Sequence, residues 1–254
     1  MNNKFILTPY FLDQHLPKLQ NITEPDWVLN TQPLPAGDQQ LRMTALHEPI
    51  AKHVAESLRA GNRPVSIAGD CCATIAVAAG LQRAAIDYAL FWFDAHGDFN
   101  TWETTPSDFL GGMPLAMLVG RGDQKMTRAL GLQSLREDRV LLTDARDLDP
   151  EEKIALRESK VTHVPNVSGL LDDPITDLPI YIHFDVDILD PLEAPAMSYP
   201  APGGPSVSEL EQVFHFLGRA KEIVAVSVST WNPDLEGSVQ TQKASRRLLD
   251  ALGL

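Results

Sequence analysis

Cysteine is almost absent from this sequence of 254 residues, and its two cysteines, Cys71 and Cys72, are adjacent. Adjacent cysteines supply no ordinary disulfide framework, so a packed core must hold the fold together. Long apolar runs are also absent, since no stretch reaches the ~20 residues of a membrane-spanning helix. The N-terminus has neither the apolar core nor the small-residue cleavage pattern of a secretory signal. These absences lead us to expect a cytoplasmic protein.

Basic residues are scarce as well: 21 Lys and Arg stand against 34 Asp and Glu, which gives a formal net charge of −13. A surface that follows nucleic-acid or lipid phosphates needs an excess of Lys and Arg, so we expect neither nucleic acid nor membrane as a partner. The acidic balance favours a small cationic or zwitterionic partner, although an acidic surface is also common in soluble proteins of other kinds.

Apolar residues make up 44% of the chain, enough for a substantial core, and we expect one domain over residues 1–254. Short β-branched or aromatic runs alternate with segments whose apolar residues recur at three- and four-residue spacing. This alternation predicts an α/β fold with a parallel sheet and helices on both of its faces. The expected strands are residues 5–11, 64–68, 88–94, 140–144, 179–187 and 223–230, and the expected helices are residues 48–60, 73–83, 114–119, 151–158, 207–220 and 240–252.

Three polar clusters, at residues 69–72, 94–98 and 185–190, stand where expected strands end. In an open α/β sheet, ligands bind beyond the carboxyl ends of the strands, so all three clusters could converge there. A convergent cluster of this kind is the natural candidate for a functional site.

Side chains two apart in an extended segment point the same way, which aims Asp94, His96 and Asp98 together, and Asp185 with Asp187. So many carboxylates in one place would repel one another unless cations lie among them. With a possible thiolate from the first cluster, these groups are enough to hold two divalent ions. Many oxygen ligands and a single imidazole suit Mn²⁺ better than a structural zinc.

Simpler explanations exist for each part of this pattern. A lone Asp-x-Asp is commonly a cap or a turn, and a lone cysteine such as Cys71 is more often a small buried apolar residue. Two acidic residues at the ends of two separate buried strands, together with His96, are harder to explain in this way. The other histidines are expected to be surface or packing residues: His15, His47, His53, His163, His183 and His215.

The same clusters resemble the arginase/agmatinase (ureohydrolase) family. Residues 69–72, Gly-Asp-Cys-Cys, resemble its Gly-Asp-His-Ser; residues 94–98 match its Asp-Ala-His-x-Asp, and residues 185–191 its Asp-x-Asp-x-x-Asp-Pro. The resemblance covers most of the chain from about residue 48 onward. It implies the family's three-layer α/β fold, with helices on both faces of a mostly parallel sheet of about eight strands.

The resemblance also implies a metal centre with two Mn²⁺ ions per chain, although a thiolate could shift the preference to a softer divalent ion. The ions would deliver hydroxide from a shared water to a guanidino carbon, and Asp98 would pass the proton to the departing nitrogen. The family's trimers and hexamers make a homo-oligomer an open possibility. Carried over by position, one ion is held by Cys71, Asp94, Asp98 and Asp185, and the other by Asp94, His96, Asp185 and Asp187.

Three further positions match substrate contacts of arginase. Asn100 and Ser107 stand where its α-carboxylate contacts are, and Asp149 where its α-amino contact is, which favours an amino-acid substrate over a decarboxylated amine. Local roles compete with this interpretation: Asn100 and Ser107 could stabilise a loop, and Asp149 could cap the helix that starts at Pro150.

Three departures from arginase refine the expected substrate. Cys71 replaces a histidine ligand, Gly111 stands where a histidine is thought to shuttle protons, and Thr230 where a glutamate pairs with the guanidinium. The same changes resemble the Nω-hydroxy-L-arginine hydrolase branch, which releases hydroxyurea and L-ornithine. A less basic hydroxyguanidine needs no paired carboxylate, and the Thr230 hydroxyl could bond to it. An ordinary arginase, a formiminoglutamate-type or other guanidino-acid hydrolase, and a catalytically silent binding module remain as alternatives.

Overall fold

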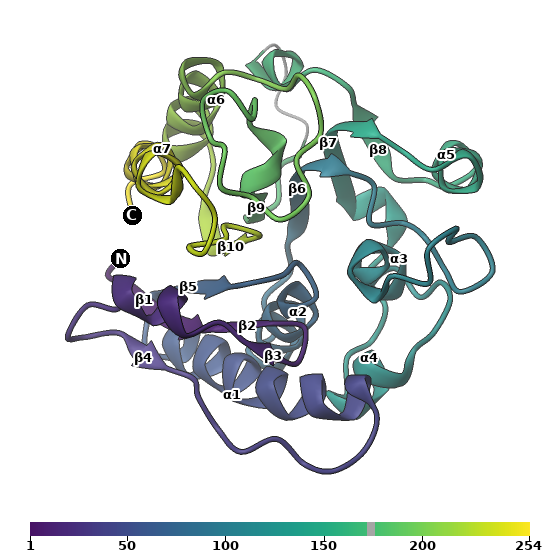
Figure 1. The fold of residues 1–254 in the computed structure, drawn as a ribbon, viewed down its shortest axis with the longest axis vertical. Helices are drawn as coiled ribbons and strands as arrows, with labels where there is room; N and C mark the ends of the chain where they lie inside the picture. Colours follow the sequence, from purple (N-terminus) through teal and green to yellow (C-terminus); the bar gives the residue numbers. More distant parts are fainter. Residues whose placement is uncertain (172–175) are drawn as a thin grey trace.

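The computed structural model describes residues 1–171 and 176–254 (Figure 1). Its strands are β1 (Asn3–Thr8), β2 (Tyr10–Phe11), β3 (Gln14–His15), β4 (Val28–Leu29), β5 (Arg63–Ala68), β6 (Ala89–His96), β7 (Val140–Asp147), β8 (Thr162–Val164), β9 (Ile180–Asp185) and β10 (Ile223–Ser229). Eight of them form one sheet in the order β4-β1-β5-β10-β9-β6-β7-β8, and every pairing in it is parallel. β2 and β3 form a separate antiparallel hairpin.

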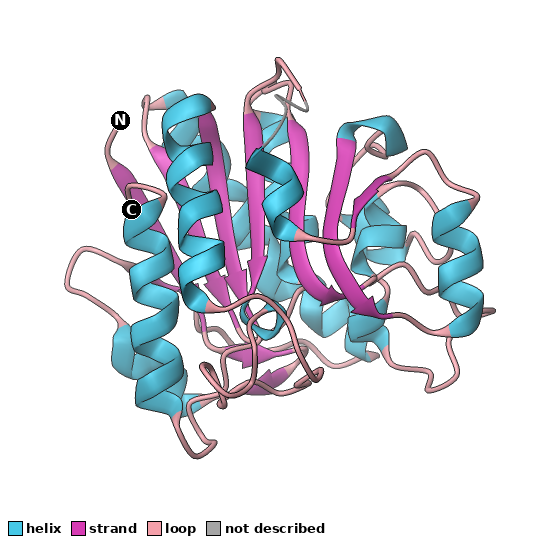
Figure 2. Cartoon of the chain, turned by 90° about the horizontal axis from the view of Figure 1, so that it is seen from above, coloured by secondary structure: helices cyan, strands magenta, loops and turns pink. Residues whose placement is uncertain are grey.

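Helices cover both faces of the sheet (Figure 2). One buried apolar cluster packs α1 to α4 against the first face, and a second packs α6 and α7 against the other. The expected three-layer α/β fold is confirmed. The α-helices are α1 (Gln39–Arg59), α2 (Ala73–Arg83), α3 (Pro114–Leu118), α4 (Lys125–Ala129), α5 (Pro150–Arg157), α6 (Val207–Ala220) and α7 (Ser238–Ala251), and the 3₁₀ helices are η1 (Pro17–Ile22), η2 (Leu110–Gly112), η3 (Glu137–Arg139), η4 (Val167–Leu171) and η5 (Val186–Ile188).

Helix α1 begins earlier than the sequence pattern predicted. The helix was expected from residue 48 on its apolar spacing, and Pro49, which has no N–H, is typical of a helix start. In the structure, Pro49 lies inside the helix instead. The carbonyl of Ala45, which residue 49 cannot reach, accepts a hydrogen bond of 3.0 Å from the Gln32 side chain. A neighbouring loop therefore supplies the donor that the proline lacks.

The first expected strand, residues 5–11, was wrong in its extent. β1 ends at Thr8, before Pro9, and Tyr10 and Phe11 pair with the next segment in the hairpin. Leu12 turns the chain there with a φ of 52°. The strands β4 and β8 and the helix α4 were also missed, because two to five residues carry too little periodic pattern to be recognised.

The topology places the polar clusters together. β9 and β10 lie between β5 and β6, although β5 and β6 come before them in the chain. Since these strands are parallel, their carboxyl ends meet at one edge of the sheet. In the part of the chain that the structure describes, no helix is long and apolar enough to cross a membrane.

Candidate metal centre

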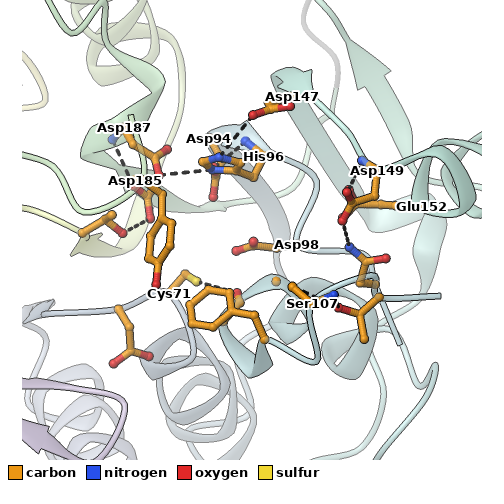
Figure 3. A pocket seen from close by; sticks show the side chains of 18 of the residues that line it. Cys71, Asp94, His96, Asp98, Ser107, Asp147, Asp149, Glu152, Asp185 and Asp187 are labelled. Atoms are coloured by element: carbon orange, nitrogen blue, oxygen red, sulfur yellow. Dashed lines mark hydrogen bonds and ion pairs between the residues drawn. The ribbon is translucent and has the colours of Figure 1, made fainter. Parts of the chain in front are cut away.

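The ten residues singled out in the sequence lie around one pocket at the carboxyl edge of the sheet (Figure 3). Cys71 comes from the turn between β5 and α2, Asp94 and His96 from the end of β6, and Asp185 from the end of β9. The pocket is lined by Cys71, Asp94, His96, Asp98, Asn100, Ser107, Asp149, Asp185, Asp187 and Thr230, among others. The structure thus brings every predicted site residue to one place.

His96 lies between two carboxylates. Its Nδ1 is 3.4 Å from Asp94 Oδ1 and 3.2 Å from Asp187 Oδ2. Burial acts to lower the pKa of His96, but the hydrogen bonds and charges of Asp187 and Asp94 outweigh it and raise this pKa to about 12. Ligand atoms of the three residues lie within 4.8 Å of one another, close enough to face one cation.

Asp98 carries a buried carboxylate oxygen without a partner. Its backbone has a φ of 49°, and its carbonyl accepts hydrogen bonds from Leu115 and Ala116 at the start of α3. These contacts fix the backbone, whereas the Oδ2 atom has no hydrogen-bond partner among the described residues. Burial, together with the charge of Asp94, raises the pKa of Asp98 well above its usual range. Such an oxygen is costly unless a cation or a proton satisfies it.

Asp185 is held by the hydroxyls of β10 and the residue that follows it. Its Oδ2 accepts from Ser229 Oγ at 2.6 Å and from Thr230 Oγ1. Burial and the charge of Asp94 raise the pKa of Asp185 to about 6. The Thr230 hydroxyl, which the sequence assigned to the substrate, therefore already donates to a carboxylate, from a backbone with a φ of 71°.

Cys71 is buried at the base of the pocket, and its thiol donates to the Gly111 carbonyl over 3.1 Å. The neighbouring Cys72 thiol and burial raise the pKa of Cys71 well above 9. Without a cation beside it, this residue is therefore a thiol. Cys72 is buried beside it, with its sulfur 3.8 Å from the Leu110 carbonyl oxygen.

The donor set fits divalent cations. Four carboxylates from Asp94, Asp98, Asp185 and Asp187 are buried together beside the imidazole of His96. Protein interiors tolerate such a concentration of negative charge only when cations or protons balance it. The unpartnered oxygen of Asp98 is the specific sign that a ligand is expected there.

His183 also belongs to this cluster, although the sequence analysis treated it as a packing or surface residue. It is fully buried in β9, and its ligand atoms lie within 4.8 Å of those of Asp94 and Asp185. The signal was its position two residues before Asp185, which places both side chains on the same face of the strand.

The predicted substrate contacts meet at the far side of the pocket. Asn100 Nδ2 donates to Asp149 Oδ2 over 2.9 Å, while Ser107 lies on an exposed loop 3.4 Å from Thr105 Oγ1. Asp149 is also the N-cap residue of α5. The local roles weighed for these residues are therefore present, and all three still line the pocket.

Sequence reasoning missed Glu152, which lies beside Asp149 in the same wall (Figure 3). It accepts hydrogen bonds from the backbone N–H groups of Phe99, at 2.8 Å, and Asp149, at 3.2 Å. Burial raises the pKa of Glu152 to about 7. Glu152 forms the capping box of α5 with Asp149, and nothing in the sequence indicated that it also faces the pocket.

An aromatic wall was also missed. Phe11, Phe109 and Tyr199 line the pocket opposite the acidic side chains, with ring centroids 4.9 Å apart for Phe109 and Tyr199 and 6.1 Å apart for Phe11 and Tyr199. The three rings come from distant parts of the chain, so no local pattern could have grouped them.

The chain is similar in sequence and fold to known proteins of one family. A family model described as the arginase family matches residues 15–253. An arginase of Bacillus caldovelox is 30% identical over 233 residues, which is 85% of this chain and 78% of the relative. An N(omega)-hydroxy-L-arginine amidinohydrolase of Streptomyces lavendulae is 28% identical over 204 residues, 79% of this chain and 72% of the relative. The crystal structure of arginase from Bacillus cereus superposes with a TM-score of 0.85 at 22% identity, covering 99% of this chain and 98% of that one, a likeness of fold.

Proposed function

Because this chain belongs to the arginase family, we propose that it is a metal-dependent hydrolase that cleaves the guanidino C–N bond of an arginine-like amino acid. We further propose Nω-hydroxy-L-arginine as the favoured substrate, with hydroxyurea and L-ornithine as products. The observation that carries the hydrolase is the buried carboxylate cluster around His96, in which Asp98 has an oxygen without a partner.

The proposed cofactor is a pair of divalent ions, with Mn²⁺ favoured by the oxygen-rich donor set. When bound, such a pair supplies hydroxide at neutral pH by lowering the pKa of a shared water. Asp98 holds the proton that this water gives up and delivers it to the departing nitrogen. The proposed ligands are Cys71, Asp94, Asp98 and Asp185 for one ion, and Asp94, His96, Asp185 and Asp187 for the other.

The preference for a hydroxyguanidine rests on Thr230. Its hydroxyl donates to Asp185, so residue 230 offers the substrate neither a carboxylate nor an unengaged hydroxyl donor. A guanidinium buried here would lack the pairing charge that it needs. An N-hydroxyguanidine is less basic than a guanidine, so its neutral form is reached at a much smaller cost near pH 7 and can enter without that pairing. The similarity to the Streptomyces lavendulae amidinohydrolase supports the same choice.

The amino-acid end of the substrate would lie at the other wall. Asp149 and Glu152 offer carboxylates to an α-ammonium group, and Asn100 and Ser107 offer neutral donors to an α-carboxylate. Among the described residues that line the pocket there is no Lys or Arg, so the α-carboxylate depends on neutral groups alone. Weak carboxylate binding and strong ammonium binding are the expected result.

The test is a comparison of kcat/KM for L-arginine, Nω-hydroxy-L-arginine, agmatine and formiminoglutamate on Mn²⁺-loaded protein, with identification of urea, hydroxyurea or formamide. We expect hydroxyarginine to exceed arginine by tenfold or more, which corresponds to ~1.4 kcal/mol of transition-state stabilisation. Equal or better use of arginine would reject the hydroxyarginine assignment. Absence of turnover on every compound by protein that holds two ions would reject the hydrolase.

An ordinary arginase is the second candidate. It is favoured by the 30% identity to the Bacillus caldovelox arginase, a relative that this chain matches over 85% of its length. Urea released from L-arginine at the higher kcat/KM would identify it.

A further inference from the structure

His183 occupies the layer directly beneath the carboxylates of the candidate metal centre. We propose that His183 is a further ligand of the ion that Cys71, Asp94 and Asp185 hold. It would give that ion an imidazole ligand, which Cys71 does not provide. This inference rests on the metal centre of the proposed function. It concerns how the ion is held rather than which substrate is cut.

Three parallel strands build this layer. The side chains of Trp92 on β6, His183 on β9 and Ser227 on β10 form one row. Two residues further along each strand, Asp94, Asp185 and Ser229 form the row above. Because side chains alternate across a strand, both rows face the same side of the sheet. The upper row holds the carboxylates, and the imidazole lies next to them in the interior.

The ring of His183 is fixed from two sides. Its Nδ1 is 2.9 Å from Ser227 Oγ, which is in turn 2.6 Å from the Tyr181 hydroxyl. The Trp92 ring packs against it with centroids 4.1 Å apart. When Nδ1–H donates to Ser227, the lone pair lies on Nε2, the nitrogen next to Ser229. Metal-binding histidines are commonly oriented in this way, with the second ring nitrogen tied by a hydrogen bond.

The Nε2 atom of His183 has almost no hydrogen-bond partner in the part of the chain that the structure describes. Its one polar contact among the described residues is a long one of 3.5 Å to Ser229 Oγ, and no hydrogen bond there joins it to Asp94 or Asp185. Buried ring nitrogens are rarely left so poorly used. A cation between these groups would satisfy the nitrogen and both carboxylates at once.

The distances suit coordination after a small contraction. The ligand atoms of Asp94, His183 and Asp185 lie within 4.8 Å of one another. Two ligands of one ion, each ~2.2 Å from it, lie at most ~4.4 Å apart. The three ligand atoms would therefore move toward one point when an ion binds between them. Asp94 would then bind both ions, next to His183 at one ion and next to His96 at the other.

The experiment compares wild type with His183→Gln and with the control His47→Gln, each loaded with Mn²⁺. His47 is matched because it is also a buried histidine with an unpartnered ring nitrogen, but it lies in α1, outside the pocket lining. Elemental analysis gives ions per chain, and X-ray absorption fine structure gives the number of bound imidazoles. Wild type and His47→Gln should show two imidazoles for two ions. His183→Gln should show one, with the affinity of one ion weakened by ~100-fold or more.

An unchanged imidazole number in His183→Gln overturns the proposal even if affinity falls, because His183 would then only orient the carboxylates. If His183→Gln fails to fold, a second variant decides the question. In His96→Ala holding one Mn²⁺ per chain, a nitrogen coupling in pulsed electron paramagnetic resonance is expected from His183, and its absence rejects the ligand. Neither readout needs a substrate. If the ions bind two imidazoles but the protein cleaves no guanidino compound, only the proposed function is refuted and the His183 ligand stands.

Discussion

The ring of Phe109 covers the α-carbon of Gly111, so that a β-carbon at residue 111 would lie 2.4 Å from two carbons of the ring. The carbonyl of the same glycine accepts the Cys71 thiol. Residue 111 is therefore enclosed by an aromatic side chain on one side and by a candidate ligand on the other. A side chain at residue 111 would therefore find no open space, because the Phe109 ring fills it.

Replacing Gly111 alone with histidine should not raise the activity on L-arginine. Gly111→His forces the Phe109 ring out of place, and we expect a loss of ~1–3 kcal/mol in the free energy of unfolding, with no gain in kcat/KM for L-arginine. Phe109→Ala combined with Gly111→His provides the room and should recover most of the lost stability. Urea denaturation of both variants and of Phe109→Ala measures the coupling. A single Gly111→His variant as stable as wild type would contradict the enclosure.

Cys71 should be detectable as a metal ligand by its sulfur. Because its thiol pKa lies well above 9, the thiolate forms only when a cation replaces the proton. Adding Co²⁺ should therefore release a proton and produce a thiolate charge-transfer band in the near ultraviolet. Cys71→Ser should abolish the band and lower affinity for Zn²⁺ or Co²⁺ more than for Mn²⁺. Cys72→Ser is the matched control, and loss of the band in that variant instead would reassign the ligand.

Metal removal should make stability depend on pH in a defined direction. The folded pKa of Asp185 is raised to about 6 by burial and by Asp94, and those of Asp98 and Asp187 are raised further. A raised carboxyl pKa contributes stability below the unfolded value near 3.8, and this contribution is lost as the pH rises through the folded value. The Tm of chelator-treated protein should therefore fall as the pH rises from about 4 through about 6 and above.

Excess Mn²⁺ should raise that Tm most at the upper end of the range, because the ions bind the ionised carboxylates. The control is Asp98→Asn, which removes one buried charge and should flatten the decline in metal-free protein. A Tm that rises with pH in the chelator would show that the carboxylate cluster is not a source of instability.

Gln32 should stabilise helix α1 through Pro49. Gln32→Ala leaves the Ala45 carbonyl without its donor, and we expect a loss of ~1–2 kcal/mol in the free energy of unfolding. In a Pro49→Ala background the new N–H can reach that carbonyl, so the same Gln32→Ala change should cost less. A double-mutant cycle by urea denaturation measures the difference. Equal costs in both backgrounds would mean that Gln32 acts elsewhere, as through its bond to Asn30.

The sequence predicted the centre of the fold and the carboxylates of the site because both follow short-range rules. β6 is an unbroken apolar run that ends in alternating polar residues, and that run alone indicates a buried strand with Asp94 and His96 at its carboxyl end. β9 repeats the pattern with Asp185. Strand periodicity and the shared carboxyl edge of parallel strands were sufficient to predict that these residues lie close together.

The remaining features depend on neighbours that the sequence does not reveal. His183 stood in an ordinary buried strand, and its proximity to Asp94 follows from the insertion of β9 beside β6. Phe109 meets Phe11 and Tyr199 only because three distant segments fold together. Likewise, α1 continues through Pro49 because a separate loop delivers Gln32. Each is a tertiary contact that overrides a local preference.

The strand order has a consequence for how this protein folds during its synthesis. β5 and β6 leave the ribosome before β9 and β10, yet they cannot become neighbours, because β9 and β10 lie between them in the sheet. Until those later strands arrive, a nascent chain has Cys71 and Asp94 on two separate fragments, with neither Asp185 nor the hydroxyls that hold it. Cation binding at the proposed site would therefore come late in biogenesis, after translation has supplied β9 and β10.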